Sequence, residues 1–388
     1  MNEILPTVET ALTAAWGGSV RLALREHLES RQHIARLDVL ASPPGMPKTV
    51  ILKRWRREGD AGFDPNSFDI DLLNDWTSLE FIARIFGKET LAPQFYVGDQ
   101  EKGYFVIEDL LEGDTLDRIL RGNNAIQAEQ AFKSYGETLG RLHAQTLGQS
   151  EAFVALQRKF DHRGVPEPDG HLGLLQTSLK RLETLGFRVQ STAYSEVQRA
   201  AKQLAQLEVF SALHHGDPIP SNAWIAKRGG LYLFDFESAH FDHAFLEAVG
   251  PRMGFPTCGL AFVNRVPEAI WRQAETAYQA ILVTYCPEAA DKTVYGSATT
   301  AACALLALAF CENWLARALV GDLPSIKLNR VRQCAIARLE AFVHTTREFN
   351  SSPALGETFT ALLIQLRSRW PSEAHNLPVY PALQEGNS

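Results

Sequence analysis

One stretch, Leu213–Ser238, constrains the fold of this chain most, because it combines a turn signal with several polar side chains. Two short apolar segments, Ala223–Ala226 and Leu231–Phe234, flank the polar sequence Lys227-Arg228-Gly229-Gly230. Glycines adopt positive φ angles at no steric cost, and apolar segments on both sides of such a loop are typical of a β-hairpin. The sequence therefore predicts a hairpin here.

The hairpin also predicts which polar residues meet at its open end. If residue 226 pairs with residue 231, both strands step outward from the turn by the same count. Asn222 and Asp235 then lie opposite each other, within about 5 Å. Asp217 precedes Asn222 by five residues, in a segment that contains two prolines. We therefore expect three oxygen-bearing side chains to converge beside the hairpin.

These three residues have the composition of a magnesium site. Mg²⁺ prefers carboxylate and amide oxygens and keeps substrate phosphates as further ligands. The spacing of His215-Gly216-Asp217, Asn222 and Asp235-Phe236-Glu237 matches the catalytic loop and metal-binding triplet of kinases, with Gly216 where protein kinases carry arginine. In these motifs the chain resembles the aminoglycoside phosphotransferase and choline kinase-like family of small-molecule kinases.

The resemblance implies a role for each motif residue. Asp217 would orient an acceptor hydroxyl and accept its proton, while Asn222 and Asp235 would hold Mg²⁺ against the phosphates of ATP or GTP. We group His215 with Asp217 in the catalytic loop, where it would brace the loop by hydrogen bonds. Glu237 would either support the metal indirectly or have a solvated or structural role.

Upstream, residues 20–53 contain runs typical of strands, and the last run ends in Val50-Ile51-Leu52-Lys53. The resemblance implies that Lys53 holds the α- and β-phosphates of the nucleotide. Taken alone, Lys53 would be a solvated lysine on an edge strand, since it begins a run of four cations. The loop over 28–33 has no glycine, so a glycine-rich phosphate flap is absent. The resemblance implies that backbone N–H groups and the Ser30 hydroxyl would hold phosphate there instead.

A helix is expected over Leu72–Phe86, because apolar residues recur there with helical spacing. The resemblance places the carboxylate partner of Lys53 on this helix. Asp75 fits the register of the family helix, whereas Glu80 has the longer side chain. Either acid could instead be solvated, so the choice stays open.

A second strand pair, Gln94–Val97 and Tyr104–Ile107, leads into the acidic segment 108–114. The resemblance implies that this segment is a hinge between two lobes. Backbone groups near Glu108 and Leu110 would bind the purine edge of the nucleotide there. Because backbone contacts do not constrain side chains, the sequence does not distinguish ATP from GTP.

From residue 115 onward the pattern is mostly helical. The expected fold class is therefore α+β: a bilobal protein kinase-like fold with a small N-terminal nucleotide-binding lobe, an antiparallel sheet with one main helix, over 1–108. A large, mostly helical C-terminal lobe over 109–388 would carry catalysis and acceptor binding. His143 lies on one of its helices, where a packed core histidine is the favoured interpretation. Glu247 lies near the place of a downstream aspartate that helps fix the catalytic loop in related kinases.

Composition excludes several other classes of protein. A net charge of −7 gives no basic field to attract nucleic acid or anionic lipid. Thr293–Cys311 has 19 uncharged residues, but its glycine, serine and threonine content favours a buried helix over a membrane span. The N-terminus lacks the pattern of a signal peptide. The unevenly spaced cysteines favour reduced core side chains in a cytoplasmic protein, and they are Cys258, Cys286, Cys303, Cys311 and Cys334.

Two other functions stay open. One is a catalytically inactive kinase-fold protein that binds a nucleotide or serves as a scaffold, which the missing glycines favour. The other is a hydrolase with a transition-metal site, although adjacent histidines point in different directions in most backbones. The residues of that site would be His214, His215, Asp217 and Asp235.

The sequence does not identify the acceptor. Aminoglycosides are cations and would need several carboxylates, for which the helical region offers Asp242, Glu247, Glu268, Glu275 and Glu312. Choline-like cations would prefer an aromatic cage, for which it offers Trp271, Tyr278 and Trp314. Ordinary helices carry as many acids and pack as many aromatic side chains. Sugars, hydroxy-amino acids and other alcohols therefore stay open as well.

Overall fold

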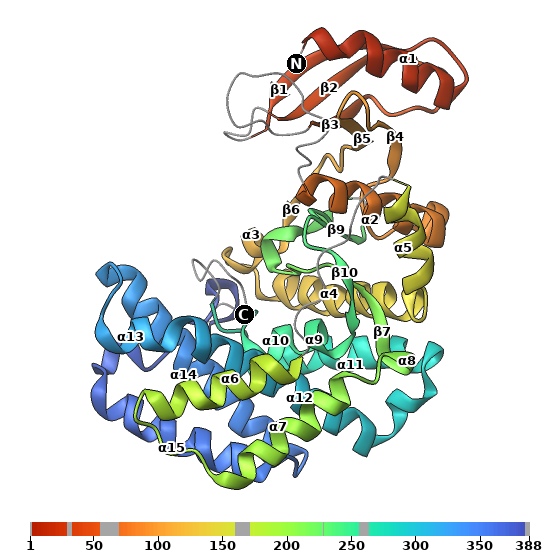
Figure 1. Ribbon diagram of the computed structural model, residues 1–388. Coiled ribbons are helices and arrows are strands. Elements are labelled where there is room, and N and C mark those ends of the chain that lie inside the picture. Colours follow the sequence, from red (N-terminus) through yellow and green to blue (C-terminus); the bar gives the residue numbers. More distant parts are fainter. Residues whose placement is uncertain are drawn as a thin grey trace.

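The computed structural model places a small sheet-containing part above a large helical part (Figure 1). The described residues are 2–28, 33–54, 70–159, 171–227, 229–255 and 264–384. Ser30, which was expected to contact phosphate, lies outside them. The α+β class with an N-terminal antiparallel sheet and a mostly helical C-terminal part is confirmed.

The N-terminal part is a five-stranded sheet in the order β1-β2-β3-β5-β4, and every neighbouring pair is antiparallel. Its strands are β1 (Arg21–His27), β2 (Ile34–Ala41), β3 (Thr49–Arg54), β4 (Phe95–Asp99) and β5 (Tyr104–Glu108). Two helices pack on it, α1 (Leu5–Trp16) and α2 (Ile70–Phe86).

Alternation along β3 determines which side chains face each helix. Val50 and Leu52 belong to the apolar cluster that includes Leu12 of α1. Ile51 belongs instead to the cluster that includes the apolar face of α2. Because successive strand residues point to opposite faces, Lys53 is directed to the same side as Ile51. The side chain of Lys53 therefore points toward α2.

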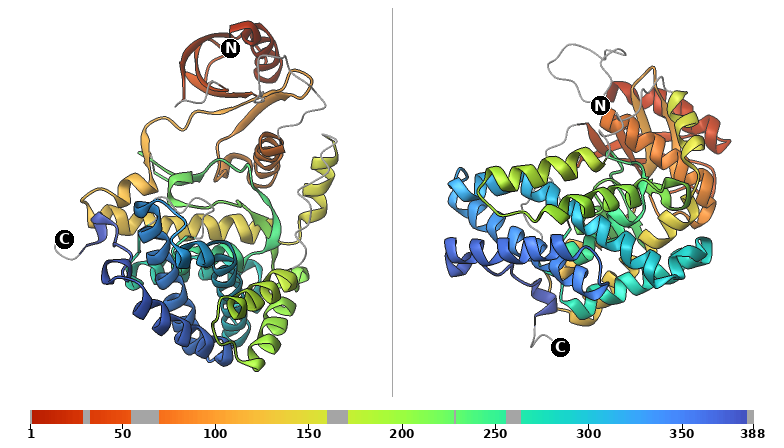
Figure 2. Two further views of the ribbon diagram at one scale, coloured as in Figure 1. Left: turned by 60° about the vertical axis from the view of Figure 1, so that its left-hand side comes forward. Right: turned by 60° about the horizontal axis from the view of Figure 1, so that its bottom comes forward.

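The C-terminal part surrounds one central apolar helix. Its helices are α3 (Leu116–Leu120), α4 (Ala125–Thr146), α5 (Ser150–Arg158), α6 (His171–Thr184), α7 (Ser191–Leu204), α8 (Leu207–Phe210), α9 (Phe245–Ala248), α10 (Gly250–Met253), α11 (Glu268–Tyr285), α12 (Lys292–Phe310), α13 (Ala316–Val320), α14 (Ser325–Glu348) and α15 (Pro353–Arg369). Both views of Figure 2 show α1 and the sheet, in red, at one end of the molecule and α15, in dark blue, at the other.

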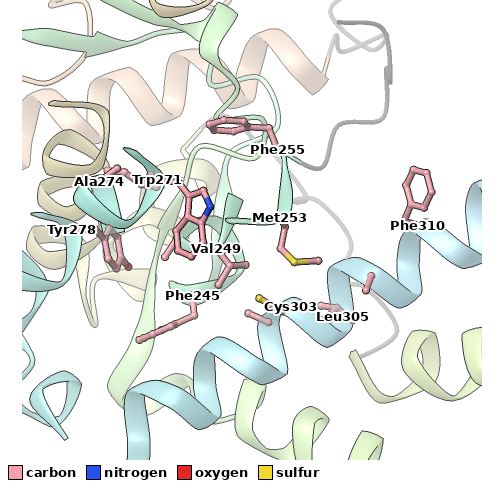
Figure 3. Packing of buried hydrophobic residues seen from close by; sticks show 14 of the residues in the cluster. Phe245, Val249, Met253, Phe255, Trp271, Ala274, Tyr278, Cys303, Leu305 and Phe310 are labelled. Atoms are coloured by element: carbon pink, nitrogen blue, oxygen red, sulfur yellow. The ribbon is translucent and has the colours of Figure 1, made fainter. Parts of the chain in front are cut away.

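The central helix is α12, which with α13 forms the apolar run Lys292–Val320. This run is long and apolar enough to cross a membrane, but 78% of its most apolar window is buried inside the protein. Helices α9 and α10 pack against α12, and Figure 3 shows Met253 pointing toward the part of α12 that carries Cys303 and Leu305. The run is therefore the core of the helical part, as the sequence indicated.

Helices α4 and α11 approach each other closely. A Cβ atom added at Gly136 would lie 2.2 Å from the carbonyl oxygen of Ala274, so only glycine fits at this crossing. About two turns further along α4, His143 lies against Tyr278 of α11. The glycine contact thus sets the position of a buried histidine beneath the site described below.

Two small sheets join the N-terminal part to these helices. β6 (Gly113–Thr115) pairs with β8 (Ala223–Ala226), which pairs with β9 (Leu231–Leu233). β7 (Ser211–His214) pairs with β10 (His240–His243). The segment between β7 and β8 contains Asp217, so both small sheets hold the ends of the predicted catalytic loop.

The predicted hairpin is present as β8 and β9, but its expected register was wrong by one residue. Ile225, not Ala226, lies opposite Leu231, and the N–H of Ala226 donates to the carbonyl of Gly230 at 3.1 Å. Gly229 and Gly230 have φ angles of 92° and 91°. Gly230 therefore belongs to the hydrogen-bonded ladder, and the loop is one residue shorter than expected.

The corrected register changes the residue opposite Asn222. The N–H of Phe234 donates to the carbonyl of Asn222 at 3.1 Å, so Phe234 takes the place expected for Asp235. Asp235 follows immediately, with a φ angle of 72°. Aspartate tolerates this left-handed conformation better than most residues. The chain turns at Asp235, which lies at the open end of the hairpin as predicted.

Candidate active site

The site is organised around Lys53, which contacts two aspartates from distant segments. Its Nζ donates to Oδ2 of Asp75 at 2.5 Å and to Oδ1 of Asp235 at 3.3 Å. The three side chains come from β3, α2 and the end of the hairpin. Lys53 is 8% exposed and Asp75 is 1% exposed, so this ion pair is almost completely buried.

The ion pair keeps the lysine charged. Burial alone would lower the pKa of Lys53, but the charges of Asp75 and Asp235 outweigh burial and raise it to about 12. Oδ1 of Asp75 also accepts the backbone N–H of Phe236 at 2.9 Å. Asp75 therefore ties the lysine strand to the Asp235-Phe236-Glu237 triplet.

The structure decides which acid lies beside Lys53. Asp75 faces the interior, whereas Glu80 accepts a hydrogen bond from Nε1 of Trp76 at 3.1 Å and pairs with Arg84 on the helix surface. The five-residue separation turns Glu80 away from Asp75, because α-helices repeat every 3.6 residues. The longer side chain of Glu80 does not bring it to Lys53, because Glu80 lies on a different face of the helix from Asp75.

Asp217 lies in the loop after β7, close to Asn222. Nδ2 of Asn222 donates to the backbone carbonyl of Asp217 at 3.0 Å and to its Oδ2 at 3.4 Å. Burial raises the pKa of the Asp217 carboxyl, and the charge of Asp235 adds to this, while His215 and the Asn222 hydrogen bond oppose it. A raised pKa makes the carboxylate a better proton acceptor.

His215 is fully buried and holds the loop through both ring nitrogens. Nε2 donates to the carbonyl of Phe234 at 2.9 Å, and Nδ1 accepts the backbone N–H of Asp217 at 3.3 Å. The ring also packs on Phe236, with 4.4 Å between the ring centres. This geometry matches the bracing role that we expected for His215 from its position two residues before Asp217.

Gly216 has the backbone conformation that only glycine adopts easily. Its φ angle is 86°, and an added Cβ would lie 2.2 Å from the carbonyl oxygen of Ser238. An arginine at this position, as in protein kinases, would clash with that carbonyl. Local steric constraints therefore explain why the motif has glycine at position 216.

Glu247 binds the same loop from below. It accepts the backbone N–H groups of His215 at 3.0 Å and Gly216 at 2.6 Å, and it pairs with Nε2 of His143 at 3.1 Å. Nδ1 of His143 contacts the hydroxyl of Tyr278 at 2.9 Å. His143 is thus a packed and hydrogen-bonded core residue, as expected. Glu247 occupies the bracing position that the sequence suggested.

The two predicted hinge residues, Glu108 and Leu110, differ in which backbone hydrogen-bonding groups are free to bind a ligand. The N–H of Glu108 is used in the sheet, where it donates to the carbonyl of Gln94 at 2.8 Å. Neither backbone group of Leu110 forms a hydrogen bond within the described part of the chain. Leu110 therefore has both backbone groups available to a ligand, whereas the N–H of Glu108 is already used.

Two further residues near the hinge were missed by the sequence reasoning. Arg36 of β2 donates from Nε to Oδ2 of Asp109 at 2.7 Å, which attaches the predicted hinge segment to the sheet. Asp109 is 7% exposed. No local pattern links two residues 73 positions apart, so only the fold reveals this contact.

A pocket of about 300 Å³ lies beside the catalytic loop, where Gly216 and Pro218 form part of its wall. The rest of its wall is mostly apolar by area and includes Leu174 of α6, Leu246 of α9 and Leu305 of α12, while His240 and Asp242 of β10 contribute polar groups. His214 also lines it, and Nε2 of this buried ring has no hydrogen-bond partner among the described residues. The pocket therefore offers apolar surface and one unsatisfied imidazole nitrogen.

The acids considered for a cationic acceptor mostly have other partners. In this pocket, burial acts to raise the pKa of Asp242, but the hydrogen bond with His171 at 3.0 Å helps lower it to about 2. Glu247 is occupied by the loop, and Glu268 and Glu275 pair with arginines. Oε2 of Glu312 is buried without a partner in the described part of the chain.

The donor set at the hairpin fits a magnesium ion. Both side-chain hydrogen bonds of Asn222 use Nδ2, which leaves its amide oxygen for a cation. The Asp235 carboxylate lies at the same end of the hairpin, and both are hard oxygen donors. Among the described residues, no three His, Cys, Asp or Glu side chains form a group that could hold a metal ion. The histidine-rich site of the hydrolase hypothesis is therefore not assembled.

Comparison with known proteins identifies the fold. No protein-family model matches the chain, and no curated protein matches its sequence. A candidate aminoglycoside phosphotransferase from Ralstonia eutropha JMP134 is similar in structure, with a TM-score of 0.51 and 10% sequence identity over 88% of this chain and 98% of that chain. At this identity the likeness shows a common fold.

Two other solved structures match with lower TM-scores. Choline kinase from Streptococcus pneumoniae matches with a TM-score of 0.39 and 12% identity over 87% of this chain and 99% of that chain. Macrolide 2′-phosphotransferase from Brachybacterium faecium matches with a TM-score of 0.42 and 14% identity over 87% of this chain and 98% of that chain. Each of these three solved structures is described as a kinase or a phosphotransferase.

Proposed function

Proceeding from this shared fold, we propose that the protein is a small-molecule kinase that transfers the γ-phosphoryl group of ATP or GTP to a hydroxyl group. One observation carries the proposal: the buried pair of Lys53 and Asp75 is hydrogen-bonded to the partly buried Asp235, although up to 182 positions separate these residues. Asp217 and Asn222 lie at the same end of the hairpin. Phosphoryl transfer depends mainly on such positioning and charge neutralisation.

The nucleotide would bind between the sheet and the hairpin. Lys53 would contact its α- and β-phosphates, and the backbone of Leu110 would bind the purine edge. A bound Mg²⁺, held by the Asn222 amide oxygen and the Asp235 carboxylate, would neutralise phosphate charge. We also propose that residue 108 ends the nucleotide-binding lobe and that 109–388 form the catalytic and acceptor-binding lobe.

Asp217 would act on the acceptor. Its carboxylate would accept the hydroxyl proton as the hydroxyl oxygen bonds to the terminal phosphorus. The bond from that phosphorus to the bridging oxygen breaks, and the nucleoside diphosphate leaves with the electron pair. His215 and Glu247 would keep Asp217 in place through the hydrogen bonds described above.

The acceptor would occupy the 300 Å³ pocket, because two residues adjacent to Asp217 form part of its wall. Its mostly apolar lining and the pairing of Asp242 with His171 favour an uncharged alcohol with an apolar body over a polycationic aminoglycoside. His214 would hydrogen-bond to a polar group of this acceptor. Its pKa is lowered to about 3 by burial, so the ring is neutral.

Two measurements separate this function from that of an inactive scaffold. Mg-ATP should raise the melting temperature of the wild-type protein, and Lys53→Met should remove this shift. ADP release with a panel of uncharged and cationic alcohols then separates an enzyme from a binder. Stabilisation by Mg-ATP without turnover on any acceptor would favour the inactive nucleotide-binding protein. Absence of both effects would refute the proposal.

A further inference from the structure

A second pocket has a volume of about 240 Å³, and three residues of α10 line it. It is formed by α10, the start of α11 and the middle of α14. Three arginines line it, Arg252, Arg265 and Arg338, together with Trp271 and His344. None of its lining residues also lines the 300 Å³ pocket beside the catalytic loop.

Arg338 of α14 is buried without a counter-charge. It is 4% exposed and forms no ion pair with any carboxylate among the described residues. Its one hydrogen bond there runs from Nη2 to the carbonyl of Phe255 at 3.1 Å, and its buried Nε has no partner. The guanidinium lies over the ring of Phe310, 4.5 Å from the ring centre. This contact does not satisfy its N–H groups.

The other charges around the pocket are already balanced. Arg252 pairs with Glu275 at 2.7 Å and Glu348 at 2.6 Å, and it stacks on Trp271. The two lining acids, Glu268 and Glu340, pair with arginines outside the pocket. Arg265 is exposed and forms no ion pair within the described part of the chain. The pocket therefore keeps an excess of positive charge at Arg338 and Arg265.

Burying an unpaired charge is unfavourable, and buried polar groups in proteins normally have hydrogen-bond partners. The chain between Phe255 and Asn264, whose sequence is Pro-Thr-Cys-Gly-Leu-Ala-Phe-Val, contains no acidic residue to supply a counter-charge. An oxyanion suits a guanidinium, because its oxygens accept two parallel N–H groups. Apolar neighbours such as Trp271 and Met253 suit an organic body attached to that group.

We propose that this pocket binds a small molecule through an oxyanion, a carboxylate or phosphate group, held by Arg338 and Arg265. The site is separate from the candidate active site and does not depend on the kinase function. An anion there would supply the missing acceptors for Arg338. It would also contact α10, whose first residue, Gly250, lines the pocket beside the catalytic loop.

The test measures melting temperature and binding heat for the full-length protein with sodium phosphate or sodium benzoate, against sodium chloride at equal ionic strength. At least one of the two anions should raise the melting temperature above the chloride value. Arg338→Met should remove this shift and weaken binding by about 10- to 100-fold, as expected for loss of hydrogen bonds to a charged group. Phosphate and benzoate distinguish the two kinds of oxyanion.

Three controls test whether the anion effect arises from Arg338 and from this pocket. Arg332→Met removes a neighbouring arginine of α14 that binds the Ala318 carbonyl outside the pocket, and it should keep the anion effect. Lys53→Met should keep it too, which separates this site from phosphate binding at the candidate active site. Without added anion, Arg338→Met should be at least as stable as wild type, because an unpaired buried charge is removed. No shift with either anion, or an equal shift in Arg338→Met, would overturn the proposal.

Discussion

Glu247 holds the backbone of the predicted catalytic loop, and its replacement by glutamine tests how much the loop depends on it. The two carboxylate oxygens accept three hydrogen bonds, from the backbones of His215 and Gly216 and from His143. An amide has only one acceptor oxygen, so at least one buried N–H must face an NH₂ group. Glu247→Gln should therefore lower the unfolding free energy by about 2 to 4 kcal/mol, the cost of losing charge-assisted bonds and leaving a buried donor unsatisfied.

Urea unfolding at several pH values is the appropriate assay. Burial acts to raise the pKa of Glu247, but the hydrogen bond with His143 helps hold it below its usual range. A lowered carboxyl pKa in the folded protein stabilises it fully above the unfolded value, about 4.3, and less as the pH falls below that. The difference between wild type and Glu247→Gln should therefore be largest near neutral pH and shrink in acid.

Glu340→Gln is the matched control, because Glu340 is half-exposed and, among the described residues, pairs only with Arg367 at the surface. Its effect should stay within about 0.5 kcal/mol, as for other surface substitutions. If Glu247→Gln costs no more than this control, Glu247 does not hold the loop. A difference that grew in acid would also contradict the reasoning.

Three further predictions concern the loop and the lysine. Gly216→Ala should lower both the melting temperature and the turnover number, because the new Cβ would lie 2.2 Å from the Ser238 carbonyl at a φ angle of 86°; wild-type values for both would contradict the geometry. Lys53→Met should raise the dissociation constant of Mg-ATP at least about tenfold, the loss of one charge-assisted contact; calorimetry showing unchanged affinity would exclude a phosphate role. Burial raises the pKa of Asp217, so turnover should fall with decreasing pH along a limb above the usual aspartate value of about 3.9. A limb at or below that value would argue against Asp217 as the base.

Much of the fold was predictable because local signals agreed with the final structure. The glycines at 229 and 230 identified the hairpin, and apolar spacing identified α2 and the central helix α12. The N-terminal helix α1 was missed, although Val8 and Leu12 on one face and a left-handed Gly17 at its end are helical signals. The hairpin register was wrong because only backbone hydrogen bonds show that Gly230 pairs with Ala226.

The site was predictable from its motifs, whereas the choices within it needed the structure. Sequence spacing placed Asp217, Asn222 and Asp235 at one end of the hairpin. Selecting Asp75 over Glu80 needed the orientation of α2 against β3, which depends on packing between distant segments. The pairing of Asp242 with His171 and the isolation of Arg338 arise in the same way, from contacts that no local pattern records.

The most direct test of the proposed activity is phosphorylation of an acceptor by the purified protein. Wild type, incubated with Mg-ATP and a metabolite mixture, should produce at least one new phosphate ester in mass spectra, with ADP in equal amount. Asp217→Asn should lose this product while binding Mg-ATP with wild-type affinity, because Asp217 acts on the acceptor and Lys53 on the nucleotide. Retention of the product in Asp217→Asn, or its absence from wild type that binds Mg-ATP, would contradict the account.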